Sequence, residues 1–141
     1  MNIFLPVSAS NGVYSEEEAR EIYAEGCLSS NIPLNKPKKG KDTHRVGNLM
    51  KLNYYIADGS VTLKDGKFSI DFNRVSETTR KMVEEVLSIQ SEGSKERAEA
   101  FIDKWSAWTP EDEYAATVMQ QCDLKLYSTV IQPAVADLLR N

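Results

Sequence analysis

His44 is the single histidine of the chain, and imidazole is the side chain that most readily changes its charge near neutral pH. It could donate a hydrogen bond to a substrate carbonyl or a developing oxyanion. It could equally be a solvent-exposed or structurally bonded histidine. Cys27 and Cys122 have no Cys or His neighbour at ligand spacing, so they match neither a paired zinc motif nor a disulfide framework. Zinc chemistry is therefore not predicted from these residues.

The sequence contains no complete catalytic set of any common type. It has no H-E-x-x-H, C-x-x-C, P-loop, G-x-G-x-x-G or G-x-S-x-G pattern. Its acidic residues fall mostly on expected exposed helix faces as Glu/Lys pairs, where solvation accounts for them. Residue types and spacing alone therefore leave His44 as the one candidate for chemistry.

Length and charge limit the classes of function. A chain of 141 residues with 41% apolar side chains favours one compact domain. Its 17 basic and 21 acidic side chains leave a net charge of -4, which disfavours nucleic acids and anionic membranes as partners. It has no apolar run near the roughly 20 residues that span a bilayer and no basic leader. We expect a cytoplasmic protein that binds no nucleic acid and no membrane.

The first 41 residues predict an irregular lead-in, a helix and a lysine-rich loop. Ser15 and Glu18 form a capping box that starts a helix running to about Leu28. Prolines, a glycine and four lysines over residues 29–41 indicate a loop. The lysines could meet a phosphate or an acidic partner, or they could simply be solvated.

His44 is positioned by a predicted helix and hairpin. Asp42 or Thr43 can cap a helix that ends at Asp58-Gly59, and the glycine within it, Gly47, suggests close approach of a neighbour. Residues 61–72 alternate at period two around Asp65-Gly66, a pair typical of a type I′ hairpin turn. The hairpin is expected to bury its apolar face.

Capping residues and glycine stops predict further helices after the hairpin. These are a long helix that opens at Asn73 or Ser76 and ends at Gly93, a helix capped by Ser94, and a helix from Thr109 toward Gln121. Residues 42–141 thus read as helix, hairpin and helical bundle, treated with residues 1–41 as one structural domain. The predicted fold class is mainly α with one β-hairpin, a compact multi-helix domain.

The order of these features resembles the C-terminal part of the dipeptidyl peptidase III family, zinc exopeptidases that remove dipeptides from the N-termini of short peptides. The family pattern is a histidine that opens a helix closed by glycine, a hairpin, a long helix, a short helix with an aromatic end, and a segment ending in Gln-Pro. The corresponding pieces are His44 to Gly59, Val61 to Phe72, Val86 to Gly93, Ala98 to Trp105 and Tyr127 to Pro133.

The resemblance implies a role within a larger protein. It implies the C-terminal part of the helical lobe of a dipeptidyl peptidase III-like zinc metallohydrolase, not catalytic by itself, which contributes to a peptide-substrate cleft. The family's H-E-x-x-G-H zinc motif is missing from this chain, and residues 15–21 look like its second zinc helix but are read as a capping box. Zinc is therefore expected in the full-length enzyme, bound by an upstream domain, and no cofactor is expected in this chain.

The resemblance also assigns residues. His44 looks like the family's active-site histidine, which binds substrate and supports the transition state. Asn48 stands where the family has an arginine, and Tyr127 stands where it has a basic residue, with Lys125 nearby. A neutral side chain cannot supply a charge-assisted hydrogen bond to a peptide carboxylate. The alternative is a non-enzymatic helical protein-interaction module.

Overall fold

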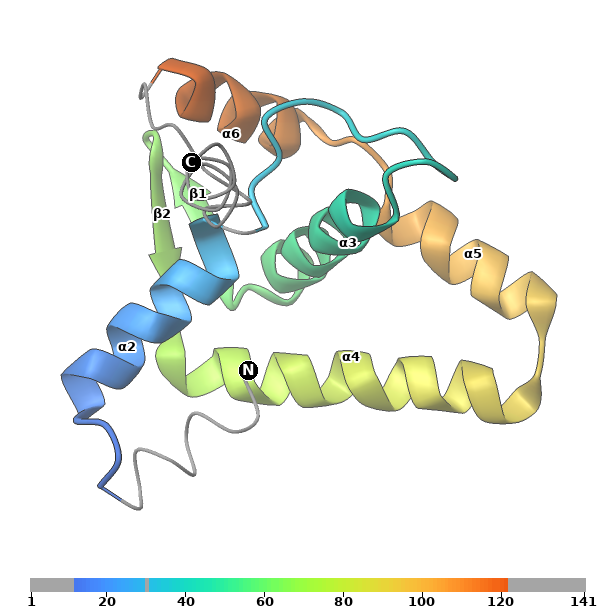
Figure 1. The fold of residues 1–141 in the computed structure, drawn as a ribbon, viewed down its shortest axis with the longest axis horizontal. Helices are drawn as coiled ribbons and strands as arrows, with labels where there is room; N and C mark the ends of the chain where they lie inside the picture. Colours follow the sequence, from blue (N-terminus) through green and yellow to red (C-terminus); the bar gives the residue numbers. More distant parts are fainter. Residues whose placement is uncertain (1–11, 30, 122–141) are drawn as a thin grey trace, which may run out of the picture.

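A computed structural model describes residues 12–29 and 31–121, and these residues form a mainly helical fold with a two-stranded antiparallel hairpin (Figure 1). The predicted fold class is confirmed at that level. The elements are α2 (Glu16–Ala24), a π-helical turn η1 (Glu25–Ser29), α3 (Thr43–Asp58), β1 (Val61–Lys64), β2 (Lys67–Ile70), α4 (Phe72–Glu92), α5 (Lys95–Trp105) and α6 (Pro110–Gln121).

Helix α3 is the central element of the arrangement. It contacts α4, α5 and β1, and Figure 1 shows it between the long helix α4 and α6. The loop between η1 and α3, residues 31–42, contains no helix or strand, as predicted from its prolines and lysines.

The core is built on two side chains of α3 that are excluded from solvent, Leu52 and Tyr55. Buried residues that precede and follow α3 in the sequence pack in the same core cluster. They are Ala19, Ile32, Val61, Val75 and Ala115. The hydroxyl of Tyr55 forms a hydrogen bond of 3.0 Å with the hydroxyl of Thr79 on α4. This bond satisfies a polar atom that burial would otherwise leave unpaired.

Local signals place most of the helix ends correctly. The side chain of Ser15 accepts from the Glu18 amide, and the Glu18 carboxylate accepts from the Ser15 amide, which completes the predicted capping box. Gly59 ends α3 in the left-handed conformation, with φ of 79°. Asp42 precedes α3, but its carboxylate accepts from the Lys38 amide in the loop and caps no amide of the helix.

The hairpin has the predicted turn and register. Asp65 and Gly66 have φ values of 50° and 73°, the two positive values that a type I′ turn requires. Val61 pairs with Ile70 and Leu63 pairs with Phe68, so the four apolar side chains share one face.

The boundary between β2 and α4 differs from the prediction. Phe72 belongs to α4 and not to the strand, and α4 begins there instead of at Asn73 or Ser76. The cause is Asp71, whose carboxylate accepts hydrogen bonds from the amides of Asn73 and Arg74. Because an N-cap side chain satisfies amides that have no partner within the helix, it sets where the helix starts.

The later helices bury less of their apolar stripes than their spacing suggests. Val86 and Leu87 on α4 are exposed, and so is Ile102 on α5. Trp105 and Trp108 are half-buried. The predicted mixed segment from residue 124 onward lies outside the described residues.

We predict that Asp71→Ala destabilises the protein by about 1 kcal/mol, because two amides of α4 lose their acceptor. Urea denaturation measures the free energy of unfolding. Asp71→Asn is the matched control, since its side chain oxygen still accepts, and it should cost only a few tenths of a kcal/mol. Equal losses in the two variants would mean that the cap is not what stabilises this boundary.

Candidate functional site

His44 lies in the first turn of α3 with its side chain exposed to solvent. Helical periodicity places Gly47 and Asn48 one turn further along the same face. Asn48 is half-buried. The imidazole is therefore open to a ligand that approaches this face of α3.

Of the four site residues expected from the sequence, the structure places two, His44 and Asn48, on one face of one helix. Lys125 and Tyr127 lie outside the described residues, so their relation to His44 stays a prediction. Both placed residues belong to α3, so the position of that helix decides what they can contact.

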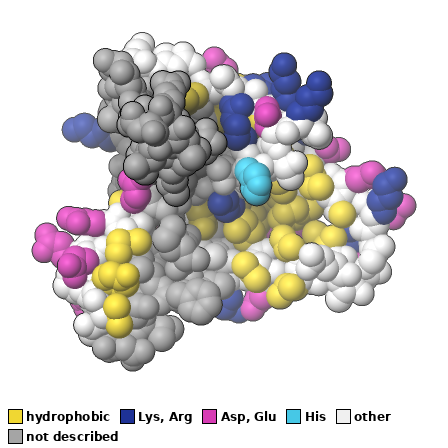
Figure 2. Space-filling model, viewed as in Figure 1, with side chains coloured by type: hydrophobic (Ala, Val, Ile, Leu, Met, Phe, Trp, Pro, Cys, Tyr) yellow, Lys and Arg dark blue, Asp and Glu magenta, His cyan; other side chains and the backbone are white. Residues whose placement is uncertain are grey.

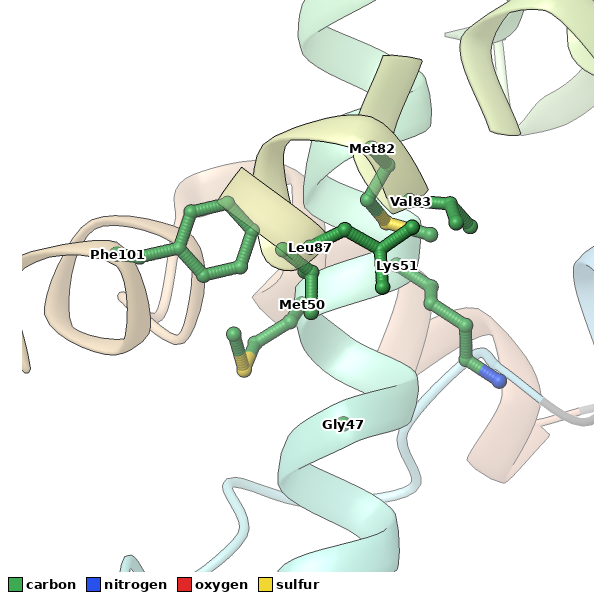
Figure 3. A pocket seen from close by; sticks show the side chains of 8 residues that line it. Gly47, Met50, Lys51, Met82, Val83, Leu87 and Phe101 are labelled. Carbon is green, nitrogen blue, oxygen red and sulfur yellow. The ribbon is translucent and has the colours of Figure 1, made fainter. Parts of the chain in front are cut away.

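An open apolar groove of about 260 Å³ lies where α3, α4 and α5 meet (Figure 3). We call it the α3–α4–α5 groove. It is lined by Gly47, Met50, Lys51, Met82, Val83, Val86, Leu87 and Phe101. The two methionines are flexible side chains that can adapt to differently shaped apolar ligands. The groove can thus receive an apolar group, and Gly47 places it one helical turn from His44.

Gly47 opens the α3 wall of this groove. Among residues 12–29 and 31–121, and apart from the backbone of its own helix and its adjacent residues, a methyl group added at Gly47 would meet no atom within 4 Å, so this part of the chain does not provide the expected close neighbour. Glycine inside a helix costs about 1 kcal/mol relative to alanine. The glycine has no close-packing role among the described residues, and its effect is to leave the groove wall without a side chain.

Figure 2 shows the same region as a surface. The histidine, in cyan, lies next to an exposed patch of hydrophobic side chains, in yellow. Leu87 is 56% exposed and Val86 is 36% exposed, and both line the groove. The candidate site therefore combines a proton-transfer side chain with an adjacent apolar surface.

Asp58 fixes the end of α3 against α4. Its carboxylate accepts from the hydroxyl of Thr78 at 2.6 Å and from the Arg74 guanidinium at 3.1 Å, and Lys81 lies 3.6 Å away. The Thr78 hydroxyl, followed by the Arg74 and Lys81 cations, holds the pKa of Asp58 below its usual range. Thr78 is fully buried while the Asp58 side chain is 20% exposed, so the contact is partly shielded from water and joins the end of α3 to α4.

Tyr54 provides another attachment of α3. Its ring centroid lies 4.6 Å from that of Trp105 on α5, and its hydroxyl donates to the Glu85 carboxylate on α4 at 3.3 Å. Burial, together with the nearby Glu85 charge, raises the pKa of Tyr54. One side chain of α3 thus contacts both of the other helices that form the groove.

The lysine-rich loop is attached beside His44. Lys39 forms an ion pair of 2.7 Å with Asp103 on α5, and Arg45 donates to the carbonyl of Asn35 at 2.9 Å. The Lys39 pair is exposed, so it contributes little stability. These contacts fix the course of the loop and account for part of its positive charge without an external partner.

The described residues do not provide a metal site. Within residues 12–29 and 31–121, no three His, Cys, Asp or Glu side chains gather closely enough to hold a metal ion. In the same residues, no helix is long and apolar enough to cross a membrane. Comparison of the chain with protein-family models, curated proteins and solved structures finds no match.

Sequence reasoning missed the groove because its residues come from three helices. A signal was present in the spacing of Met82, Val83, Val86 and Leu87, which places four apolar residues on one stripe of α4. The Asp58–Thr78 contact was missed because Asp58 was read only as part of a helix stop. Neither feature can be located until the crossing of α3 and α4 is known.

We predict that Thr78→Val costs about 1 kcal/mol at pH 7, because the Asp58 carboxylate loses its shortest hydrogen bond. The loss should shrink as the pH falls. A group with a lowered pKa contributes stability above its unfolded value, about 3.9 for aspartate, and loses it as the pH falls through the folded pKa.

Urea denaturation at several values between about pH 2.5 and pH 7 measures this difference. Glu99→Gln is the control, since within the described part of the chain Glu99 takes part in an exposed pair with Lys95, and removing that pair should change stability little. A Thr78→Val loss that is independent of pH would contradict the assigned contact.

Proposed function

We propose that this chain is the C-terminal helical part of a dipeptidyl peptidase III-like zinc metallohydrolase, in which the face of α3 that bears His44 borders the peptide-substrate cleft. The observation that carries the proposal is the exposed imidazole of His44, one helical turn from an open apolar groove. The order of helix, hairpin, long helix and short helix agrees with the family pattern. The proposal includes a cytoplasmic location and a hydrolase activity that belongs to the larger protein.

The role of His44 follows from its chemistry. A neutral imidazole can donate an N–H to the carbonyl oxygen of a bound peptide, and this hydrogen bond strengthens as negative charge develops on that oxygen. The contacts of Asp58 and Tyr54 attach α3 to α4 and α5, which fixes the helix that carries the imidazole.

Zinc in such an enzyme would polarise the peptide carbonyl and activate water. The described residues of this chain do not fit a zinc site, so the proposal assigns the metal to an upstream domain of the same protein. The chain by itself should accordingly bind no catalytic zinc and cleave no peptide. The neighbouring Asn48 can orient a substrate by neutral hydrogen bonds but cannot pair with a carboxylate as an arginine does.

We predict that His44→Ala lowers kcat for a dipeptidyl arylamide by about 10²- to 10³-fold in the protein containing all segments that its gene encodes, the range for loss of an oxyanion donor. Lys95→Ala, an exposed change on α5, is the matched control and should leave kcat unchanged. Zinc content should stay the same in both variants. Full activity in His44→Ala, or catalytic zinc in residues 1–141 alone, would contradict the proposal.

The groove itself favours a second candidate, a non-enzymatic helical interaction module. Its occupant would be an apolar face of a peptide or helix, because the residues that line it are nearly all apolar. Exposed apolar side chains such as Leu87 are costly to leave in water, and such patches often mark binding surfaces. In this second candidate function, His44 takes no part in catalysis or binding.

We predict that Gly47→Leu lowers binding of the apolar dye 1-anilinonaphthalene-8-sulfonate at least several-fold, because the new side chain fills the groove. Gly47→Ala is the matched control. It has the space it needs and should stabilise α3 by up to about 1 kcal/mol while leaving most dye binding intact. Equal dye binding by wild type and Gly47→Leu, measured by fluorescence titration, would show that the groove is not the apolar binding surface.

A further inference from the structure

Asp112 is a fully buried acid in the first turn of α6. One of its carboxylate oxygens, Oδ2, accepts from the Thr109 amide at 2.8 Å and from the Thr109 hydroxyl at 3.0 Å. The Thr109 hydroxyl in turn accepts from the Asp112 amide at 3.2 Å. The two residues form a reciprocal capping box in which Asp112 takes the usual place of glutamate or glutamine.

The second carboxylate oxygen of Asp112 is unsatisfied. Among the described residues, Oδ1 of Asp112 has no hydrogen-bond partner, and neither has the buried hydroxyl of Ser106. Leaving a buried polar atom unpaired costs about 1–3 kcal/mol, and more when the group is charged. The ionised form of Asp112 is therefore disfavoured here, whereas a proton on Oδ1 removes the charge and makes this oxygen a donor.

Asp112 lies where three parts of the fold meet. The Asn53 carboxamide of α3 donates to the carbonyls of Trp105 and Ala107, at 2.9 Å and 3.0 Å, which ties the connection between α5 and α6 to α3. The Asn53 side chain also lies close enough to Asp112 to influence the pKa of its carboxylate. A change of charge at this point therefore bears on the contact between α6 and α3.

The charged surroundings of Asp112 are simple among the described residues. Thr109 in the connection and Asn53 on α3 are neutral, and Glu111, the preceding residue, is the charged group that acts on it. Burial raises the pKa of Asp112 above its ordinary value, and the Glu111 charge adds to this, while the Thr109 hydrogen bonds oppose it.

The exposed capping box of α2 shows the contrast. There the hydrogen bonds from Ser15 lower the pKa of Glu18, because they favour its charged form and this exposed position provides little burial to oppose them. The same motif thus has opposite pKa shifts in the two helices, and burial is the difference. A stability contribution from Asp112 is present below the ordinary aspartate value of about 3.9 and is lost as the pH rises through the higher folded value.

We propose that the Thr109–Asp112 capping box is a pH-sensitive latch, which holds the start of α6 against α3 while Asp112 is protonated and loosens when Asp112 ionises. The inference is independent of the function proposed for His44. It predicts that acidification tightens this junction while it weakens the Asp58 contact at the C-terminal end of α3.

Intrinsic fluorescence can report on the latch directly. The chain has two tryptophans, and both Trp105 and Trp108 flank this junction. Because the Trp108 indole also donates to the Glu113 carboxylate at 2.6 Å, the measurement uses the full 141-residue chain with Glu113→Gln. We expect its emission to change between pH 3.5 and pH 8 with a single midpoint above about 3.9. Asp112→Asn should abolish this transition, and Glu18→Gln should leave it unchanged.

Hydrogen exchange gives a second measurement. As the pH rises and Asp112 ionises, amide protection at the start of α6 should fall, after correction for the intrinsic pH dependence of exchange. The total fall should be up to about tenfold for each unit by which the Asp112 pKa exceeds the ordinary value. Carboxyl-carbon NMR of the wild type reads that pKa directly, so the proposal is decided even if Asp112→Asn fails to fold. A carboxyl midpoint at or below about 3.9, or a fluorescence transition that persists in Asp112→Asn, would overturn it.

Discussion

Leu52 and Tyr55 on α3 are excluded from solvent, and the side chains that cover them come from segments both before and after α3 in the sequence. This burial is the constraint on which the rest of the structure depends. Each fully buried side chain of this size contributes roughly 1.5–3 kcal/mol, so rotating α3 by one residue would lose much of the core. His44 lies eight residues before Leu52 and about three turns before Tyr55, so it falls on the same side of α3 as these core residues and is exposed in the first turn of the helix.

Local sequence rules predicted the elements whose ends are set by their own residues. Asp65-Gly66 specifies the hairpin turn through positive φ values, and Ser15 and Gly59 mark helix ends through hydrogen bonds within a few residues. The predicted start of α4 was wrong because two local sequence signals favoured different structures for the same residues. Phe72 continues the period-two pattern of the strand, but the Asp71 cap, which satisfies two amides, overrides it.

The candidate site was less predictable because it depends on how helices cross. An exposed position for His44 was one of the two readings left open, and the structure places the side chain in solvent. Val86 and Leu87 share the apolar stripe of α4 and yet are exposed, because periodicity cannot tell a stripe covered by the same chain from one left open. Asp112 shows the same limit, since its spacing indicates a cap and only the packing of α6 and α3 makes it a buried acid.

The two proposed functions make different demands on the same exposed surface. Under either one the α3–α4–α5 groove is covered by something apolar, because side chains such as Leu87 gain roughly 25 cal/mol for each Å² removed from water. In an interaction module the partner needs to cover only the groove, and His44 can stay in water without cost. In a peptidase cleft a substrate must reach His44 as well, and that requires a ligand which extends one helical turn beyond Gly47 along α3. The length of α3 that a ligand protects, and not the groove alone, therefore separates the two functions.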